Sequence, residues 1–529
     1  MKFFLQRILF FLPSFLIFST SSVFGQFQNV LISSSNSPEE VSIYINPKNP
    51  NQVVAGANID NVFHSTDGGH TWAINTLTDA ANGVWGDPCI FSDTAGNFYF
   101  IHLANPPTGG NWIDRIVCAK STDGGSTWSN GTYTGLNGTK AQDKAWTAVN
   151  PSTNEIYVTW TQFDVYGSSA STDSSIILFS KSADGGATWS VPKRISKFAG
   201  DCIDSDNTVE GAVPAVGPNG EIYVAWVGSN GLVFNKSLDD GNTWLPQETF
   251  VTAVPGGWDY NISGLQRCNG LPITLCDLSN GPNRGTIYIN WTDQRNGTTD
   301  TDVWLIKSSD GGNTWSSVIR VNDDAPGKQQ FLTWMCIDKS NGTIYCDYYD
   351  RRNYPASSSQ TDVYLARSTD GGNTFSNYKI NQTAFTPDPG IFFGDYIGIS
   401  AYNDAVRPIW MSYNGSTLSA WTAIVDGSTL AINELSNANV SPIAFLQNSP
   451  NPFYHTTWIK FKLKKTENVN LFVYDVLGTK VATLYQNEKF NEGSYDYIFN
   501  SSLYNLKPGV YYYSLCCDEY RRTEKMIVY

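Results

Sequence analysis

Histidine and charged residues are scarce in this sequence. Its 529 residues include four histidines and no Cys-x-x-Cys pair, which disfavours a zinc site. Charged residues make up 16% and the net charge is −14, so nucleic acids and anionic membranes are disfavoured as partners. The last 87 residues hold ten Lys and Arg against eight Asp and Glu, so the acidic excess lies before them.

Long hydrophobic runs are also rare, and one stands near the start. Lys2 and Arg7 precede an apolar stretch from Ile8 to Phe18, and small residues follow in Ser22-Val-Phe-Gly25. This order predicts a signal peptide at residues 1–25, cleaved before Gln26. The stretch is too short to span a bilayer and no later run is longer, so we expect no transmembrane segment in the mature protein.

What the sequence has in abundance is typical of an extracellular all-β protein. Aromatic residues make up 14% of the chain and glycine occurs 45 times, with Thr, Ser and Asn between short apolar runs. We therefore expect many short strands and few helices.

One eight-residue pattern, Ser-x-Asp-Gly-Gly-x-Thr-Trp in its commonest form, occurs six times. Its aspartates lie 56, 61, 55, 71 and 60 residues apart: Asp67, Asp123, Asp184, Asp239, Asp310 and Asp370. Such a period fits one four-stranded sheet per repeat, so the sequence predicts a repeat array. The Asp side chain is expected to accept hydrogen bonds from backbone N–H groups one or two residues on, while the glycines allow positive φ and the aromatic residue anchors the turn. We therefore interpret these aspartates as structural.

The pattern resembles the Asp box of the sialidase-like (BNR) β-propellers. The resemblance implies a propeller whose Asp boxes lie on the face opposite the usual binding site, and it is weak for function because folds host many functions. Six repeats fit one blade each. After the sixth, three further strands lack a partner, and Gln28-Asn-Val-Leu-Ile-Ser-Ser34 could supply the fourth and close the ring. We therefore prefer seven blades, with six as the alternative, over residues 26–432.

The last part of the chain differs from the repeats. Asn448-Ser-Pro-Asn-Pro-Phe453, Val473-Tyr-Asp-Val-Leu-Gly478 and Leu506-Lys-Pro-Gly-Val-Tyr511 resemble the C-terminal sorting domain of the type IX secretion system of Bacteroidetes. We expect a small β-sandwich at residues 443–529 after a linker at 433–442, with a carbohydrate-binding sandwich as the alternative. The resemblance implies passage through the periplasm and then release or display at the outer cell surface, with the secretion machinery as a partner.

The nine cysteines leave at least one unpaired in any disulfide scheme. Cys336 and Cys346 flank a short turn, and Cys268 and Cys276 flank the start of a strand. We expect these two pairs as the candidate disulfides of an exported protein.

Carboxylates begin several of the expected inner strands. Aligning these strands places Glu40, Asp87, Asp143, Glu210 and Asp395 at one mouth of the channel. Like charges this close raise one another's pKa or require a cation. Asp87, Asp143, Glu210 and Asp395 are therefore the candidate acid and base residues.

The loop before Glu210 is rich in oxygen ligands. Asp201, Asp204 and Asp206 together with Glu210 would suit Ca²⁺, although the EF-hand spacing and glycine are absent. Calcium and a solvated acidic loop both remain as interpretations, and the sequence indicates no other cofactor.

Aromatic and charged residues gather in the expected joining loops. The set suited to sugar contacts is Trp112, Trp258, Asp293, Arg295, Asp350, Arg352 and Arg407. The alternative is that Asp293 with Arg295, and Asp350 with Arg352, are ion pairs that hold these loops.

The sialidase resemblance implies three arginines, an Asp acid and a Tyr nucleophile paired with Glu. In that family the first arginine precedes the first Asp box, whereas no Arg lies between residues 8 and 114 here. Two functions are therefore predicted: a glycan-binding propeller that also hydrolyses glycans as a glycoside hydrolase of sialidase-like fold, and a non-catalytic propeller that binds glycans or proteins at the cell surface.

Overall fold

The computed structural model describes residues 27–430, 443–445, 447–448, 450–463, 465–517 and 520–529. The chain divides into two compact units, Met1–Asp426 and Gly427–Tyr529, which are described separately. The predicted signal peptide at 1–25 and the predicted linker at 433–442 lie outside the described residues.

Within residues 27–430 the first unit contains seven sheets of four antiparallel strands. The first three, in spatial order, are β2 (Ser42–Ile45), β3 (Val53–Ala57), β4 (Asn61–Ser65), β5 (Ala73–Thr76); β6 (Gly86–Ser92), β7 (Phe98–Leu103), β8 (Ile116–Ser121), β9 (Thr132–Thr134); and β10 (Ala141–Val149), β11 (Ile156–Phe163), β12 (Ser175–Ser182), β13 (Lys193–Arg194). The next three are β14 (Glu210–Val216), β15 (Ile222–Val227), β16 (Leu232–Ser237), β17 (Thr249–Thr252); β20 (Ile273–Cys276), β21 (Ile287–Asp293), β22 (Asp302–Ser308), β23 (Ile319–Arg320); and β24 (Gln330–Ile337), β25 (Ile344–Asp350), β26 (Asp362–Ser368), β27 (Ser376–Lys379). A small insertion, β18 (Asp259–Tyr260) with β19 (Cys268–Asn269), precedes β20.

The remaining four-stranded sheet of this unit joins the two ends of the repeat region. Its order is β1 (Gln28–Ser33), β30 (Leu418–Asp426), β29 (Ala405–Tyr413), β28 (Gly398–Tyr402). Val30 pairs with Thr422 and Leu31 with Trp421. The strand predicted to complete this sheet from the start of the chain is therefore in place, and the pairing covers an edge that would otherwise be open.

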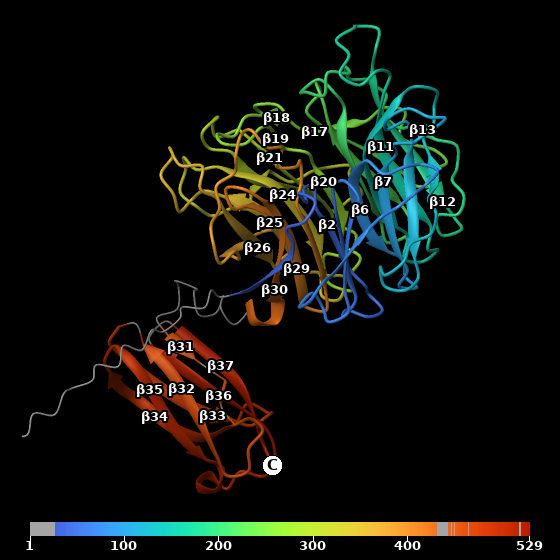
Figure 1. Cartoon of the computed structure of the whole chain (residues 1–529). Helices are drawn as coiled ribbons and strands as arrows, with labels where there is room; N and C mark the ends of the chain where they lie inside the picture. The colour runs from blue at the N-terminus through green and yellow to red at the C-terminus, as the bar shows by residue number, and fades with distance from the viewer. Residues whose placement is uncertain (1–26, 431–442, 446, 449, 464, 518–519) are drawn as a thin grey trace, which may run out of the picture. The chain divides into compact units, whose positions relative to one another are not determined.

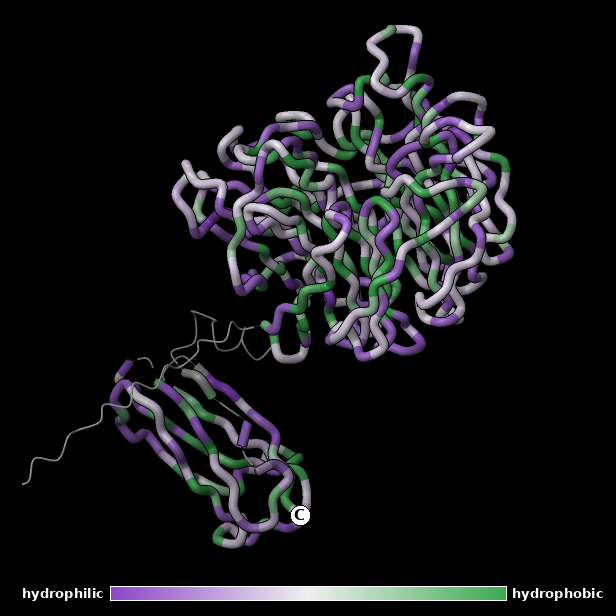
Figure 2. Tube along the Cα trace, viewed as in Figure 1, coloured by the Kyte–Doolittle hydropathy of each residue, from purple (hydrophilic) through white to green (hydrophobic). Residues whose placement is uncertain are grey.

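The sheets are arranged as blades around a centre. The first strand of each blade contacts the first strand of the next, and β28 of the last blade contacts β2 of the first. Figure 1 shows β2, β6 and β20 near the middle of this unit and β12 and β13 at its periphery. Hydrophobic stretches run along the strands while many connecting loops are hydrophilic (Figure 2). The all-β Asp-box propeller class predicted from the sequence is confirmed.

Each Asp box is locked by the same hydrogen bonds. In the fifth, Asp310 accepts from the backbone N–H of Thr314 at 2.9 Å and from its hydroxyl at 2.6 Å, while the Ser308 hydroxyl donates to Asp310 at 2.7 Å. The backbone N–H of Gly312 donates to the Ser308 hydroxyl at 2.9 Å. The turn thus closes over four residues rather than the expected one or two, because the bound Thr follows both glycines.

The second unit is a two-sheet β-sandwich in its described part. One sheet has the order β31 (Ile443–Phe445), β32 (Thr456–Leu463), β35 (Gly493–Asn500), and the other has β34 (Lys480–Phe490), β33 (Glu467–Tyr474), β36 (Gly509–Cys517), β37 (Tyr520–Val528). A short 3-10 helix, η1 (Ser501–Tyr504), follows β35. Side chains of β32 alternate strictly between exposed and buried, and Phe461 packs in a shared core with Leu471 and Leu515. The alternation places one apolar face of each sheet inside.

Candidate functional site

The first strands of several blades begin with a bulge that aims a charged side chain at the ring centre. The pairing shifts between Gly86 and Cys89 in β6 and between Asp143 and Trp146 in β10. Asp87 and Lys144 adopt positive φ at these bulges, with values of 55° and 50°, and Glu40 does so before β2 with 49°. A bulge leaves its extra residue outside the ladder, so the side chain can be directed away from the sheet.

Lys144 lies at the centre of the resulting cluster. Its ammonium is 2.9 Å from Asp87, 2.9 Å from Asp395 and 3.3 Å from Glu40, and all four side chains are at most 10% exposed. Burial alone would lower the pKa of Lys144, but the three carboxylates outweigh it and hold that pKa well above its ordinary value. One buried cation therefore links its own blade to three others.

Arg267 covers this cluster from the insertion before β20. Its Nε donates to Asp395 at 2.8 Å, its terminal nitrogen lies 3.3 Å from Asp204, and its guanidinium stacks 5.0 Å from the ring of Phe392. Burial would raise the pKa of Asp395, but Lys144 and Arg267 lower it well below the usual range. Asp395 is thus an ionised carboxylate.

Other carboxyl groups of the cluster have raised pKa values. Burial raises the pKa of Asp143 to about 7, and Asp87 adds to the shift against the opposing charge of Lys144. Burial and then Asp204 and Asp143 raise the pKa of Glu210 well above its ordinary value. Within the described part of the chain, Glu210 Oε1 is buried without a hydrogen-bond partner. The cluster therefore holds carboxyl groups whose pKa values are shifted in opposite directions.

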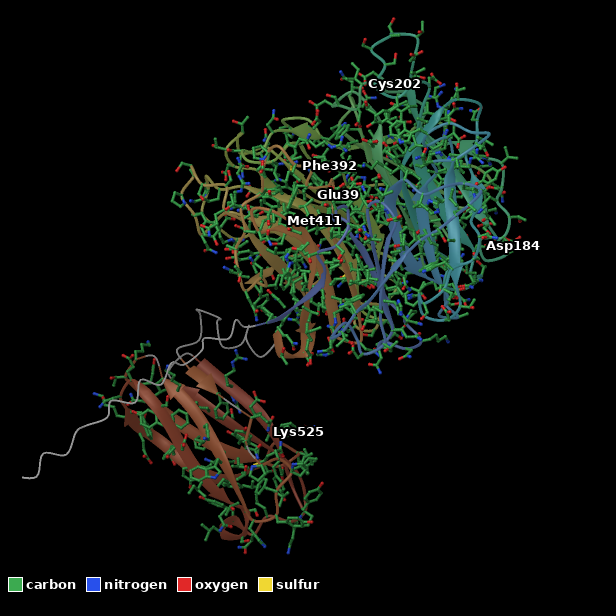
Figure 3. The ribbon with its side chains drawn as sticks, viewed as in Figure 1. Glu39, Asp184, Cys202, Phe392, Met411 and Lys525 are labelled. Atoms are coloured by element: carbon green, nitrogen blue, oxygen red, sulfur yellow. The ribbon has the colours of Figure 1, made fainter. Side chains whose placement is uncertain are left out.

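Glu39 lies beside the same cluster. Burial, followed by the charges of Asp395 and Asp87, raises its pKa to about 7. Figure 3 labels Glu39 and Phe392, which mark the part of the propeller where the cluster lies, and Asp184 of the third Asp box, which lies at the periphery.

A row of aromatic side chains leads from the surface to the cluster. The ring of Trp112 lies edge-on to Trp85 at 5.8 Å and to Tyr166 at 5.5 Å. Trp85 and Trp112 are 38% and 43% exposed, and the Tyr166 hydroxyl donates to Asp204 at 2.6 Å. The aromatic row, Trp85, Trp112 and Tyr166, thus connects open surface with the charged cluster.

Two hollows adjoin the cluster. One, of about 20 Å³, is lined by Lys144, Asp204, Glu210, Trp258, Arg267 and Asp395 among others. It holds a water molecule at most, because Arg267 lies across it. A second, open hollow of about 380 Å³ shares Trp258 and is lined by Asp206, Asn207, Ser229, Asn230 and Phe250 among others.

The structure brings together the carboxylates that the strand alignment placed at one mouth. Glu40, Asp87 and Asp395 all contact the ammonium of Lys144, and the charge of Asp143 raises the pKa of Glu210. Trp258 is 5% exposed and its indole N–H donates to the Thr208 carbonyl at 3.2 Å, so it walls both hollows and presents little open face.

The two Asp and Arg pairs of the joining loops are ion pairs. Arg295 Nε donates to Asp293 at 2.9 Å, and Arg352 Nε donates to Asp350 at 2.8 Å. Both aspartates are fully buried, and the guanidinium groups stack on Trp304 at 4.7 Å and Tyr364 at 4.1 Å. This geometry supports the interpretation that these pairs hold the loops.

Arg407 lies away from the predicted mouth. Its buried guanidinium donates to the carbonyl of Gly68 in the first Asp box and to that of Val425 at 3.0 Å. The expectation that Arg407 binds substrate is therefore corrected: the side chain fixes the first blade to the last at the Asp-box end.

The four candidate calcium ligands face different partners. Asp201 accepts from Thr208 at 2.9 Å, Asp206 accepts from the Asp259 N–H at 2.9 Å, and Asp204 binds Tyr166 and Arg267. Among the described residues no three acidic, His or Cys side chains are grouped to hold a metal ion. The structure therefore does not gather the candidate calcium ligands of this loop into one site.

The two predicted disulfides are absent. In the part of the chain that the structure describes, neither Cys268 with Cys276 nor Cys336 with Cys346 forms a disulfide. Cys336 pairs across the ladder with Tyr345, and Cys346 with Met335, so the two thiols are offset by one residue. The expected link across this turn is therefore not formed.

Sequence reasoning missed Lys144, Arg267 and Trp85. The alignment of strand starts predicted Asp143 at this position. In the structure its neighbour Lys144 has the positive φ that Asp87 and Glu40 also have, and Lys144 is therefore the residue in register with them. Arg267 lies in the longest interval between Asp boxes, 71 residues, which signals an insertion. Trp85 could have been found from the sequence, because it stands two residues before the candidate site residue Asp87.

The fold defines an Asp-box propeller followed by a C-terminal β-sandwich. Residues 449–529 match the family described as "Secretion system C-terminal sorting domain". This tail implies export by type IX secretion to the cell surface or the medium. Among the residues that the structure describes, no helix is long and apolar enough to cross a membrane.

Similarity to characterised proteins is limited. A xyloglucanase of Paenibacillus sp is 29% identical over 224 residues, which cover 38% of this chain and 19% of that protein. Two similar solved structures are the Hadza microbial sialidase Hz136 (12% identity, 71% of this chain and 73% of that one, TM-score 0.41) and an ulvan lyase of family PL25 (13%, 76% and 96%, TM-score 0.46).

Proposed function

We propose that this protein is an exported propeller that binds a neutral polysaccharide on the face carrying the charged cluster. The observation that carries the proposal is the aromatic row, because it runs from exposed Trp85 and Trp112 to Tyr166, whose hydroxyl binds Asp204 at 2.6 Å. Sugar CH groups stack on aromatic faces, and nearby polar groups fix the orientation of a bound ring.

The balance of charge around the row favours uncharged sugars. Lys144 and Arg267 face the carboxylates of Asp87, Asp204 and Asp395, which outnumber the two cations. Burial raises the pKa of Glu40 well above its ordinary value, so Glu40 is not counted among these charges. An anionic sugar would be repelled unless it displaced one of these groups. The Paenibacillus relative is named for xyloglucan, and this supports a neutral polysaccharide as the class.

Glycoside hydrolysis is the second candidate, and it is favoured by the two carboxyl groups, Glu210 and Asp395, that line the same small hollow. Burial raises the pKa of Glu210 well above its ordinary value, whereas Lys144 and Arg267 lower that of Asp395. Hydrolysis needs one carboxyl as an acid and another as a base or nucleophile. The hollow of about 20 Å³ is too small for a sugar ring, so Arg267 would have to swing away first.

The decisive experiment pairs a glycan array with a reducing-sugar assay on the same panel of polysaccharides. Wild-type protein, Trp112→Ala and Glu210→Gln are compared, with Trp458→Ala as a control because Trp458 is 44% exposed on the C-terminal sandwich. Binding of neutral glycans that Trp112→Ala loses and Glu210→Gln keeps supports the binding function. Sugar release that Glu210→Gln abolishes adds hydrolysis. Binding of a protein partner with no glycan on the array contradicts the proposal.

A further inference from the structure

The centre of the propeller contains a cavity separate from the charged cluster. Its volume is about 220 Å³ and its wall is built from the first strands of all seven blades, β2, β6, β10, β14, β20, β24 and β28. Wall residues include Tyr44, Trp146, Leu275, Trp334 and Ile397. The cavity therefore lies on the axis of the ring.

Three aromatic side chains close the end of the cavity nearest the charged cluster. Trp146 lies 4.7 Å from Trp334 and 4.7 Å from Tyr396, measured between ring centroids. The ammonium of Lys144 is 5.9 Å from the Tyr396 ring, on the side of the cluster. A ligand of the cluster and a ligand of the cavity would thus be separated by this aromatic layer.

The opposite end is lined by turns that follow the first strands. Pro47 and Lys339 stand in these turns and contribute to the wall. The turn after β2 also meets the first Asp box, where the Gly68 N–H donates to the Asn51 carbonyl at 2.8 Å. Access to the cavity is therefore from the Asp-box end of the ring.

The cavity wall offers few side-chain groups that could form hydrogen bonds with water. The Ser42 hydroxyl accepts from the Ile90 N–H at 2.9 Å, the Ser400 hydroxyl accepts from the Ile45 N–H at 3.0 Å, and the Thr147 hydroxyl contacts the Cys89 thiol at 3.3 Å. Among the described lining residues, Lys339 alone is charged. Among the described lining residues the Tyr396 hydroxyl is buried without a hydrogen-bond partner, whereas the three hydroxyls named above are engaged. A cavity whose wall is mostly apolar holds water weakly.

We propose that this cavity is a binding site for a small uncharged molecule with one or two aromatic rings. An apolar cavity of about 150 Å³ takes up benzene, so about 220 Å³ suits a ring system up to the size of indole. Tryptophan and tyrosine rings at the closed end offer edges and faces against which such a ligand packs. The site does not depend on the polysaccharide proposal, because the aromatic layer divides the two.

The test uses toluene and indole as probes and the full chain as the protein. Binding is measured by calorimetry and by the rise in melting temperature, for wild type and for Ala148→Phe, which fills the cavity from β10 where Ala148 is half-buried. Val191→Phe is the matched control, because Val191 is 88% exposed. We expect wild type and the control to bind at least one probe, and Ala148→Phe to bind it at least tenfold more weakly.

A second readout keeps the proposal testable if Ala148→Phe does not fold. Cys336 lines the cavity and is half-buried, so its alkylation by neutral monobromobimane can be followed by mass spectrometry, at raised pH because burial raises the pKa of this thiol. We expect saturating indole to slow labelling of Cys336 in wild type at least fivefold. No binding of either probe at millimolar concentration, equal binding by Ala148→Phe, or unchanged labelling of Cys336 would overturn the proposal.

Discussion

The ammonium of Lys144 lies 2.9 Å from the carboxylate of Asp395, which joins the third blade to the segment that opens the last one. Both side chains are at least nine-tenths buried, and Asp87 and Glu40 complete the shell around the cation. A buried ion pair of this kind is costly to break on one side, since the partner is left without compensation.

Replacing Lys144 with Met should therefore destabilise the propeller. The loss leaves Glu40, Asp87 and Asp395 facing one another without Lys144, and removing one partner of a buried pair costs about 3–5 kcal/mol. Urea unfolding measures the change, with Lys181→Met as a control because Lys181 forms a half-exposed pair with Asp240. A loss under about 1 kcal/mol for Lys144→Met would mean that the cluster adds little to stability.

The stability of the propeller should fall as the pH rises from about 4 through about 7. Asp143 and Glu39 have pKa values of about 7 in the folded protein, above the ordinary values of carboxyl groups. Their contribution is complete below the unfolded pKa, near 4, and is lost as the pH rises through about 7, because the folded state binds more protons in this window. We expect a higher melting temperature at pH 5.5 than at pH 8, and a smaller difference for Asp143→Asn with Glu39→Gln. Equal differences in the variant and wild type would rule out these two groups as the cause.

Removal of residues 27–34 should lower the melting temperature sharply. Strand β1 pairs with β30 along Gln28 to Ser33, so its loss opens the last sheet and exposes an edge. Differential scanning calorimetry measures the effect, and light scattering reports the aggregation expected from an open edge. An unchanged melting temperature would show that the ring does not depend on this strand.

Deletion of residues 443–529 should leave the propeller folded but stop its export. The two units form separate compact bodies, and the tail matches a sorting domain family over 449–529. Cell fractionation and circular dichroism measure the two outcomes. Normal amounts of the truncated protein in the medium or on the surface would contradict the sorting role.

The sequence predicted the repeats well because each Asp box is a local hydrogen-bonded turn. Ser308, Asp310 and Thr314 lie within seven residues, so the pattern and the structure coincide. The pairing of Val30 with Thr422 was also predictable, because the last blade lacked a strand and the start of the chain had one to spare.

The candidate site was predicted only in part because its contacts cross the ring. The carboxylates were visible as residues at strand starts, whereas the bulge that places Lys144 rather than Asp143 in register with Asp87 leaves no sequence signature. The hydrogen bond from Arg267 to Asp395 joins segments distant in sequence, and amino-acid composition alone does not predict such a contact. The role of Arg407 was predicted wrongly, because the sequence does not show at which end of the propeller an arginine on a strand makes its contacts.

The central claim, binding of a neutral polysaccharide along the aromatic row, is tested most directly by calorimetric titration with xyloglucan. Wild type is compared with Trp112→Ala. Trp458→Ala is the control, because Trp458 is exposed to the same extent as Trp112. We predict binding by wild type and by Trp458→Ala, and at least tenfold weaker binding by Trp112→Ala, because the variant removes the middle ring of the row. Equal affinity for all three proteins, or tighter binding of a sialylated or sulfated glycan than of any neutral one, would contradict the account.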